Sequence, residues 1–312
     1  MALRPARFPH LVLATCVAAV AALVTAAPAH AREGEQADPP NWGLDRIDQR
    51  EGLDQRYRYP ADAANVTVYV IDSGVDGTHP DFEGRVWRGR DFVDGDDYAR
   101  DTNGHGTGLA GIVGGEAHGV AKGVTIVPVR VVDAEGGGNG LTVVAGIDWV
   151  ANHARQPAVA LLGIGGPAGE AVDSAARGLA EKMPVVVPAG GAGGEAGQFS
   201  PGRVPEVLTV AASDRADRPT ETSNFGPAVD LYAPGAGIRV PGLGGGTFEL
   251  TGTSAAAAHV AGVAAVYRSL HPEATPAQTV AALTGGAIEG ILEGVPENTA
   301  NRLLHSPPDS GE

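Results

Sequence analysis

Apolar runs of strand length alternate with helix-forming stretches along most of this chain. The strand-like runs lie at residues 66–71, 125–132, 159–162, 184–187, 207–211 and 229–232. The helix-like stretches lie at residues 107–113, 141–155, 170–182, 254–270 and 275–283. Strands that alternate with helices over short turns predict an α/β fold of three layers. We expect a doubly wound, mainly parallel sheet that is covered by helices on both faces.

Three short segments within this pattern carry the residue types of serine nucleophilic catalysis. Val-Ile-Asp72-Ser-Gly ends a predicted strand, whereas Gly-His105-Gly-Thr and Gly-Thr-Ser254-Ala each start a predicted helix. In this chemistry a hydroxyl attacks, an imidazole takes its proton and a buried carboxylate orients the imidazole. A helix N-terminus also offers N–H donors to a developing oxyanion. Ser254, His105 and Asp72 are therefore the predicted nucleophile, base and orienting acid.

The order Asp, His, Ser along the chain differs from the order in other hydrolase families. With these motifs the chain resembles the subtilisin-like serine proteases (subtilases, peptidase family S8), in the branch similar to proteinase K. Four further segments fit the resemblance, namely Thr78-His-Pro-Asp-Phe82, Gly119-Val-Ala-Lys122, Ser223-Asn-Phe-Gly226 and Tyr232-Ala-Pro-Gly235. The resemblance covers residues 40–304. It implies a subtilisin-like fold and an endopeptidase that acts on polypeptide substrates without a catalytic cofactor.

The chain is acidic, with 37 Asp and Glu residues against 22 Lys and Arg residues and a formal net charge of −15. This balance argues against nucleic acid or an anionic membrane as a partner. It favours a soluble secreted protein, which we expect to be a monomer. No composition break or repeat divides the chain after its first forty residues, so we expect one peptidase domain at residues 40–306 and a short tail at 307–312.

The first 31 residues have the pattern of a secretory signal peptide. Two arginines form a basic start, residues 11–27 are apolar, and Ala29-His-Ala31 fits a small-residue cleavage site. A membrane anchor is the alternative, and lipid attachment at Cys16, the only cysteine, is another. We expect cleavage after Ala31, which leaves an extracellular chain without cysteine and without membrane attachment.

Residues 32–39 alone separate this signal from the peptidase-like region. Subtilases of this branch usually carry a pro-domain there, and eight residues cannot build one. We expect no pro-domain in this interval. Three alternatives remain open: the chain folds unaided, a helper acts in trans, or the precursor is longer.

The resemblance also exposes a departure at the predicted oxyanion site. A subtilase normally stabilises the oxyanion with the N–H of the serine and with an Asn side chain that ends an Ala-Gly-Asn turn. Here the turn reads Ala189-Gly190-Gly191, and Gly191 has no side chain to donate. Thr253 resembles a family residue whose hydroxyl can assist, and water is another substitute. Because removal of one such donor from a subtilisin costs about 10²–10³ in kcat, we expect a slow endopeptidase. The alternative is an impaired relative that binds extended peptides.

The resemblance further implies that the substrate lies as an extended strand between two glycine-rich edges, above the floor of a primary pocket. The predicted residues of the edges and the floor are Gly136, Gly137, Gly138, Gly163, Ile164, Gly165, Ala189 and Gly190. The floor carries no charged residue in the sequence, which predicts a broad or apolar preference. For the first edge, an ordinary flexible loop is the alternative.

Two structural calcium positions are also implied by the resemblance. The first set is the carbonyls of Pro205 and Val207 with the Asp230 carboxylate, and the second set is Asp45, Asp48, the Gln49 carbonyl and Asp54. Carboxylate and carbonyl oxygens are the ligands that calcium prefers. For the second set, the alternative is that these are solvated acidic residues of a loop.

Overall fold

The computed structural model describes residues 1–2 and 32–306 of the chain. The predicted signal peptide, apart from its first two residues, and the predicted tail at 307–312 lie outside this part. Residues 32–306 belong to one unit.

A nine-stranded sheet with the order β14-β15-β11-β10-β8-β6-β3-β5-β4 forms the centre of this unit. The strands are β3 (Thr67–Asp72), β4 (Arg90–Asp91), β5 (Thr125–Arg130), β6 (Ala158–Leu162), β8 (Val185–Pro188), β10 (Leu208–Ser213), β11 (Leu231–Pro234), β14 (Ile288–Glu289) and β15 (Arg302–Leu303). Neighbouring strands are parallel except for β14 with β15. The six predicted strands are all present, each within two residues of its expected bounds.

Both faces of this sheet are buried, as the continuous apolar runs predict for parallel strands. Along β3 the side chains alternate between two hydrophobic clusters. Val68 and Val70 belong to the cluster on one face, whereas Tyr69 and Ile71 belong to the cluster on the other. The period-2 alternation of a strand therefore divides one apolar run between two cores.

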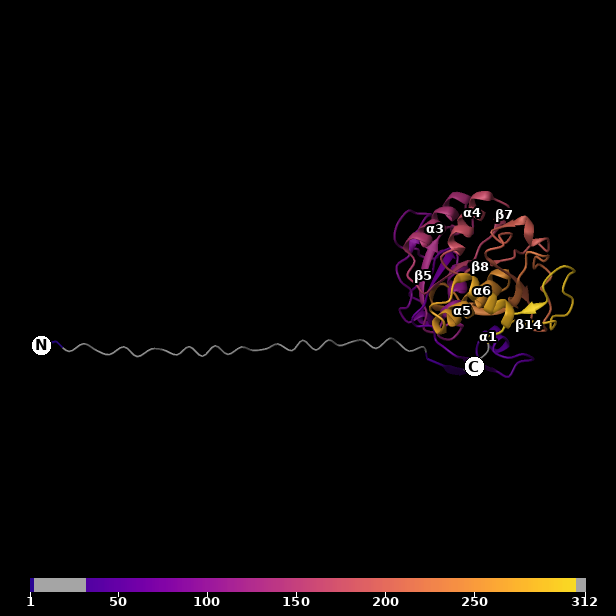
Figure 1. The fold of residues 1–312 in the computed structure, drawn as a ribbon, viewed down its shortest axis with the longest axis horizontal. Helices are drawn as coiled ribbons and strands as arrows, with labels where there is room; N and C mark the ends of the chain where they lie inside the picture. Colours follow the sequence, from indigo (N-terminus) through magenta and orange to yellow (C-terminus); the bar gives the residue numbers. More distant parts are fainter. Residues whose placement is uncertain (3–31, 307–312) are drawn as a thin grey trace. The chain divides into compact units, whose positions relative to one another are not determined.

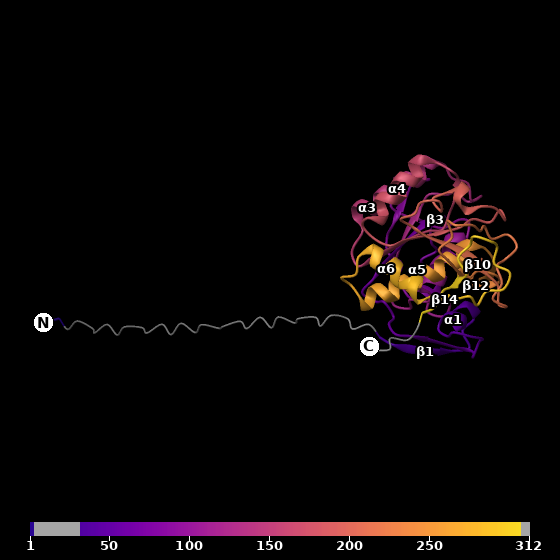
Figure 2. The same ribbon diagram turned by 45° about the vertical axis from the view of Figure 1, so that its right-hand side comes forward.

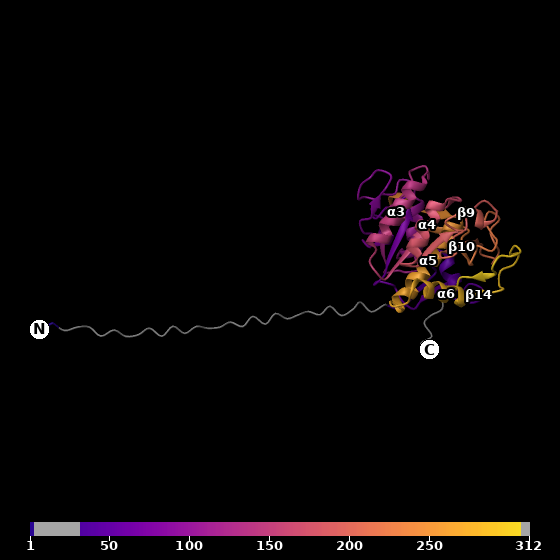
Figure 3. The same ribbon diagram turned by 45° about the horizontal axis from the view of Figure 1, so that its top comes forward.

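Helices cover each face and complete three layers, so the predicted fold class is confirmed. The helices are α1 (Trp42–Ile47), α2 (His105–Gly114), α3 (Gly140–His153), α4 (Glu170–Ala180), α5 (Thr253–Leu270) and α6 (Pro276–Gly286). Side chains of α2, α5 and α6 pack in the cluster with Val68, and those of α3 and α4 pack in the cluster with Ile71. Figures 1 and 2 show α3 beside α4, apart from α5 and α6, and Figure 3 shows α3 beside α4 from another side.

Several short elements had no counterpart in the sequence prediction. They include the strands β4, β14 and β15 near the edges of the sheet, helix α1 and three antiparallel pairs, β1 (Gly34–Ala37) with β2 (Arg56–Tyr59), β7 (Gly166–Pro167) with β9 (Phe199–Ser200), and β12 (Ile238–Pro241) with β13 (Thr247–Leu250). Figure 2 shows β1 and α1 at one edge of the unit. These elements lack a long apolar run, which is the signal that the prediction used. Among the described residues, no helix is both long enough and apolar enough to span a membrane.

The strand order places a crevice at the end of β3. This strand pairs with β5 on one side and with β6 on the other. The chain crosses from β3 to β5 on the first side, whereas from β6 it crosses to β8 in the opposite direction. In open parallel sheets such a reversal of strand order separates the loops at the carboxyl ends of the strands and creates a binding crevice. Asp72 is the last residue of β3 and therefore stands at this crevice.

Helix α6 begins with a complete capping box, and a substitution at its N-cap tests how much this local motif stabilises the protein. The Thr275 hydroxyl accepts from the Gln278 N–H, and the Gln278 side chain accepts from the Thr275 N–H. We expect Thr275→Ala to lower the free energy of unfolding by about 1 kcal/mol, measured by urea denaturation. Thr284→Ala is the control, because that hydroxyl bonds only to carbonyls of the same helix. Equal losses in the two variants would contradict the capping role.

Candidate active site

Asp72, His105 and Ser254 meet at the crevice beyond β3. His105 Nδ1 lies 2.8 Å from Asp72 Oδ1, and His105 Nε2 lies 2.9 Å from Ser254 Oγ. Both distances are those of ordinary hydrogen bonds. The structure therefore brings the three predicted catalytic residues into one continuous hydrogen-bonded chain.

Two helix N-termini present the imidazole and the hydroxyl. His105 is the first residue of α2 and follows Gly104, whose φ of +104° is readily adopted only by glycine. Ser254 is the second residue of α5 and follows Gly252 and Thr253. The N-cap residue of each helix is a glycine, Gly104 for α2 and Gly252 for α5, which has no side chain to bond the first N–H groups. The N–H groups of the first turn of α5, with the helix dipole, therefore remain available beside Ser254.

The electrostatics of the triad favour proton uptake by the imidazole. Asp72 is fully buried, and its Oδ1 also accepts a 2.7 Å hydrogen bond from the Ser73 N–H. The negative charge of Asp72 raises the pKa of His105, and the hydrogen bond to Asp72 and the charge of Asp101 act in the same direction. Burial of the imidazole opposes this shift. The net result is a base that holds a proton more readily than a free histidine.

Gly163 lies directly against the second oxygen of Asp72. Asp72 Oδ2 is buried and has no hydrogen-bond partner within the described structure. A Cβ atom at residue 163 would lie 2.3 Å from Asp72 Oδ2 and 2.3 Å from Leu109 Cδ1. Real Cβ atoms do not approach other atoms this closely, so a glycine at this position leaves room for the carboxylate.

The turn at the predicted oxyanion site is ordered by Asn224. Its Oδ1 accepts from the N–H groups of Ala192 and Gly194, and its Nδ2 donates to the Ala189 carbonyl. Gly190 has a φ of +104°, and a Cβ there would lie 2.3 Å from Asn224 Nδ2. By contrast, no atom lies within 4 Å of the position that a Cβ would take at Gly191. The turn therefore requires glycine at 190, whereas the space at 191 is open.

Thr253 joins this turn to the start of α5. Its Oγ1 accepts a 3.2 Å hydrogen bond from the Gly190 N–H. A hydroxyl that accepts one hydrogen bond still has its own proton to donate. The structure thus places a second polar group beside Ser254, at the position where the sequence suggested assistance to an oxyanion.

Two neighbouring cavities beside the triad are lined by the predicted substrate-binding residues. A cavity of about 420 Å³ is lined by Ser254 and by the predicted Gly163, Gly165, Ala189, Gly190, Gly191 and Thr253. A second cavity of about 490 Å³ is lined by the predicted Gly136, Gly137, Gly138, Ile164 and Gly165. Gly165 lines both, so the cavities are neighbours. Within the described residues, neither lining contains a charged side chain.

Of the first predicted calcium set, Asp230 has the features of a cation ligand. Its Oδ2 accepts a 2.7 Å hydrogen bond from the Thr209 N–H. Burial raises the pKa of Asp230 to about 6, against the lowering effects of that hydrogen bond and of the more distant Arg302. A half-buried carboxylate with so little compensation would be stabilised by a cation, and carboxylate with carbonyl oxygens suits calcium. The donor chemistry of Asp230, Pro205 and Val207 therefore fits that ion.

The second predicted set is engaged in other contacts. Both oxygens of Asp45 accept hydrogen bonds, from the N–H groups of Asp54 and Gln55 and from the Gln49 side chain. The Gln49 carbonyl accepts from the Arg46 guanidinium at 3.0 Å. Across residues 32–306, no three His, Cys, Asp or Glu side chains gather as a metal site. The oxygens of Asp45 and of the Gln49 carbonyl therefore already accept other hydrogen bonds, and calcium binding by this set stays a prediction.

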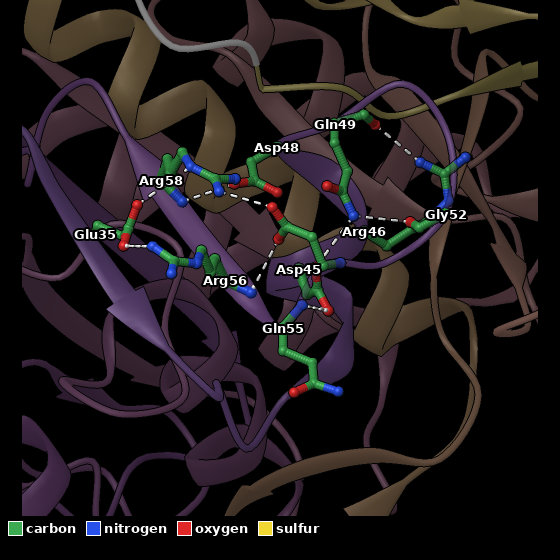
Figure 4. Close-up of polar contacts among 10 residues, drawn as sticks. Glu35, Asp45, Arg46, Asp48, Gln49, Gly52, Gln55, Arg56 and Arg58 are labelled. Carbon is green, nitrogen blue, oxygen red and sulfur yellow. Dashed lines mark hydrogen bonds and ion pairs between the residues drawn. The ribbon is translucent and has the colours of Figure 1, made fainter.

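Arg58 supplies positive charge to the carboxylates around the second predicted calcium set. The Arg58 guanidinium lies 2.7 Å from Asp54, 3.3 Å from Glu35 and 3.5 Å from Asp48, and the Arg58 N–H donates to Asp48 at 2.7 Å. Figure 4 shows Arg58 between Glu35 and Asp48, with Arg56 also directed at Glu35. The hydrogen bond from Arg58 lowers the pKa of Asp54, whereas burial raises that of Asp48 to about 6. Asp48 and Asp54 are thus paired with the Arg58 guanidinium rather than simply solvated.

The sequence prediction missed two residues that organise the site. Asn224 holds the oxyanion turn, and Asp101 is a buried carboxylate just before the helix of His105. A signal for Asp101 was present, because Asp101-Thr-Asn-Gly104 is a run of turn-forming residues directly before a helix. For Asn224 the Ser-Asn-Phe-Gly segment was noted as a landmark, but its distance from residue 190 in sequence hid the contact.

Comparison with known proteins gives a consistent result. The model of the subtilase family matches residues 63–306. An extracellular serine proteinase of Thermus sp. (strain Rt41A) is 42% identical over 273 residues, which cover 86% of this chain and 67% of that protein. The alkaline serine exoprotease A of Vibrio alginolyticus is 42% identical over 271 residues, which cover 86% of this chain and 51% of that protein. The chain thus spans between about half and two thirds of the length of these relatives.

Solved structures agree with the sequence relatives. The crystal structure of a cold adapted subtilisin-like serine proteinase superposes with a TM-score of 0.84 at 43% identity, and the match covers 85% of this chain and 97% of that one. A protease from Pseudoalteromonas arctica superposes with a TM-score of 0.72 at 25% identity, over 79% of this chain and 89% of that one.

The close approach of Gly163 to the triad gives a sharp test of the site geometry. We expect Gly163→Ala to displace Asp72 or Leu109, because the added Cβ would lie 2.3 Å from both side chains. Overpacking of this kind costs about 1–3 kcal/mol of stability, measured by thermal unfolding, and the shifted carboxylate should lower activity. Gly178→Ala is the matched control, since no atom lies within 4 Å of a Cβ there. Unchanged stability and activity in Gly163→Ala would contradict the packing at Asp72.

Proposed function

The chain belongs to the subtilase family of serine proteases, and from this premise we propose that it is a secreted endopeptidase that hydrolyses peptide bonds with Ser254, His105 and Asp72. One observation carries the proposal: hydrogen bonds run without a break from Asp72 Oδ1 through the imidazole to Ser254 Oγ. A hydroxyl, a base and an orienting acid in this geometry are the machinery of acyl transfer.

Each residue has one step in the proposed reaction. His105 carries its proton on Nδ1, directed at Asp72, so Nε2 is free to take the proton of Ser254 as Oγ attacks the substrate carbonyl. Asp72 stabilises the imidazolium that forms. The imidazolium then gives its proton to the leaving amine, and the acyl-enzyme remains on Ser254. A water molecule, activated by the same imidazole, attacks the ester and regenerates the hydroxyl.

The two cavities beside Ser254 support an extended polypeptide as the substrate. Gly163–Gly165 and Gly136–Gly138 line their walls with little side chain, which leaves backbone groups accessible for strand addition. The linings lack charged side chains within the described residues, so they support a broad or apolar preference. Binding of this kind needs no second copy of the chain, in keeping with the expected monomer.

The open position at Gly191 supports slow turnover. The backbone N–H of Ser254 is one oxyanion donor, and a side-chain donor from residue 191 is missing. Thr253 or a water molecule is the proposed substitute, each less well fixed than an amide side chain in the cavity. The same observation favours the second candidate function, a relative that binds extended peptides but scarcely cleaves them.

For structural calcium, the proposal is confined to Asp230 with the carbonyls of Pro205 and Val207. When bound there, the ion would supply positive charge to a half-buried carboxylate and would take no part in bond cleavage. We do not extend the proposal to Asp45 and its neighbours, whose oxygens already accept other hydrogen bonds.

Secretion is proposed from the signal pattern at residues 1–31, and the name of the Thermus relative, an extracellular serine proteinase, supports it. An acidic chain with no cysteine after residue 16 suits an oxidising exterior without depending on disulfides.

Labelling with a fluorophosphonate tests the proposed function directly. Attack of Ser254 Oγ on phosphorus, with loss of fluoride, attaches the probe only where the base and the nucleophile are correctly placed. We expect the folded mature protein to be labelled and Ser254→Ala to remain unlabelled, as read by intact mass. A folded sample that hydrolyses no peptide ester or anilide and resists the probe would refute the proposal. Labelling without peptide hydrolysis would favour the peptide-binding alternative.

Gly191→Asn tests the origin of the slow turnover. The site has room for the side chain, and the regained amide should raise kcat by up to about 10²–10³-fold with little change in KM, because the donor acts mainly in the transition state. Steady-state kinetics on a peptide anilide measure both constants. Gly191→Ala is the control for side-chain bulk. An unchanged kcat in Gly191→Asn would mean that another group already fills this role.

Chelation tests the proposed calcium ligand set. Removal of an ion present at about one hundred times its Kd lowers the free energy of unfolding by about 2.7 kcal/mol, so EDTA should lower the melting temperature. We expect Asp230→Asn to abolish this sensitivity and Asp45→Asn to retain it. A melting temperature unmoved by EDTA, or sensitivity lost only in Asp45→Asn, would overturn the assignment.

A further inference from the structure

Asp101 is a buried carboxylate that no step of the proposed reaction uses. Asp101 is 4% exposed and lies on the loop that leads into α2. Oδ1 accepts hydrogen bonds from Ser73 Oγ at 2.9 Å and from the N–H groups of Asn103 and Gly104 at 2.9 and 2.8 Å. Oδ2 accepts from the N–H and the hydroxyl of Thr107, at 2.8 and 2.6 Å. Five donors therefore converge on one side chain.

These donors come from the two elements that carry Asp72 and His105. Ser73 directly follows Asp72 at the end of β3, and its Oγ accepts a 2.9 Å hydrogen bond from the Gly106 N–H of α2. Gly104 and Thr107 flank His105 at the start of α2. The carboxylate of Asp101 and the hydroxyl of Ser73 thus form a polar bridge between the end of the strand and the start of the helix.

The packing around this bridge leaves little freedom for another arrangement. A Cβ at Gly106 would lie 2.2 Å from the Gly74 carbonyl and 3.2 Å from Asp72 Oδ1, so the helix start sits directly on the strand end. The N-cap of α2 is Gly104, which has no side chain to bond the first N–H groups of the helix. Asp101 fills that role from three positions upstream.

We propose that Asp101 is a positioning residue that fixes the helix start carrying His105 against the strand end carrying Asp72. This inference rests on the proposed function, because it concerns the geometry of that triad. It does not make Asp101 a catalytic residue, since its oxygens are fully engaged by donors and touch neither His105 nor Ser254.

The donor pattern requires a carboxylate rather than an amide. Both oxygens of Asp101 face only donors, and a carboxylate is an acceptor at every lone pair. An asparagine would turn one NH₂ group toward either the Ser73 and Gly104 donors or the two Thr107 donors. At least one donor would then be left unpaired in a buried place, which loosens the bridge.

Asp101→Asn, compared with a matched buried carboxylate, tests the proposal. We expect kcat on a peptide anilide to fall about 10- to 100-fold, because small displacements of a catalytic group have effects of this size, with little change in KM. His105 acts as a base only when neutral, so kcat/KM falls as the pH drops through its pKa. Since the charge of Asp101 raises the pKa of His105, its removal should move this acid limb to lower pH.

Asp81→Asn is the matched control for loss of a buried carboxylate. Asp81 is also buried and accepts from the Ala117 N–H and the His118 imidazole, away from the triad. We expect this variant to lose stability but to keep kcat and the acid limb. A merely structural role of Asp101 would give the same result as Asp81. An unchanged kcat or an unmoved acid limb in Asp101→Asn would therefore overturn the proposal.

Two further measurements keep the test decisive. Ser73→Ala breaks the bridge without changing a charge, so it should lower kcat and leave the acid limb in place; full activity there would count against the bridge even if Asp101→Asn fails to fold. NMR titration of the His105 imidazole in a Ser254→Ala background reports its pKa without turnover. We expect Asp101→Asn to lower the pKa of His105 in this titration. Because the titration needs no turnover, it tests the role of Asp101 even if the parent protein has no peptidase activity.

Discussion

The buried negative charge of Asp72 is the constraint on which the arrangement of the site depends. A carboxylate removed from water is costly unless partners compensate it. Here the compensation is the His105 imidazole at 2.8 Å and the Ser73 N–H at 2.7 Å. Because Oδ2 has no partner within the described structure, most of the stabilisation comes through Oδ1. The carboxylate therefore favours the protonated imidazole, which is the state that forms when Ser254 gives up its proton.

Other carboxylates of this acidic chain are compensated in different ways. Five short hydrogen bonds satisfy Asp101 without a cation. Arg58 lies among Asp48, Asp54 and Glu35, in the segment where the family resemblance implied a calcium ion. Asp230 accepts one hydrogen bond from the Thr209 N–H, and burial raises its pKa to about 6. An acidic loop in sequence is therefore not enough to indicate a metal site, because nearby guanidinium groups can hold the same charges.

Periodicity and motif order predicted the layers of the fold and the triad, because both signals are local. Each central strand is one apolar run. Asp72 is the last residue of such a strand, whereas His105 and Ser254 lie at the starts of helices. The contacts that the sequence did not reveal join residues far apart in the chain. Asn224 orders the turn at Gly190 from a separate loop, and short pairs such as β12 with β13 have no apolar run to announce them. Hydrogen bonds and close contacts between residues so far apart in the sequence form only in the folded chain, so no local pattern predicts them.

Three glycines around the triad differ in whether the packing requires a glycine. Gly163 and Gly190 are required by packing, since a Cβ at either would lie 2.3 Å from another side chain. Gly191 is different: its φ is outside the left-handed region and no atom lies within 4 Å of its Cβ position. The missing side chain at 191 is therefore not a consequence of the turn. In the proposed reaction, His105 has both of its hydrogen-bond partners in place, while stabilisation of the oxyanion is left to the start of α5 and to Thr253. Because only interactions that strengthen in the transition state accelerate the reaction, the proposed absence of a donor at residue 191 would limit turnover more than binding.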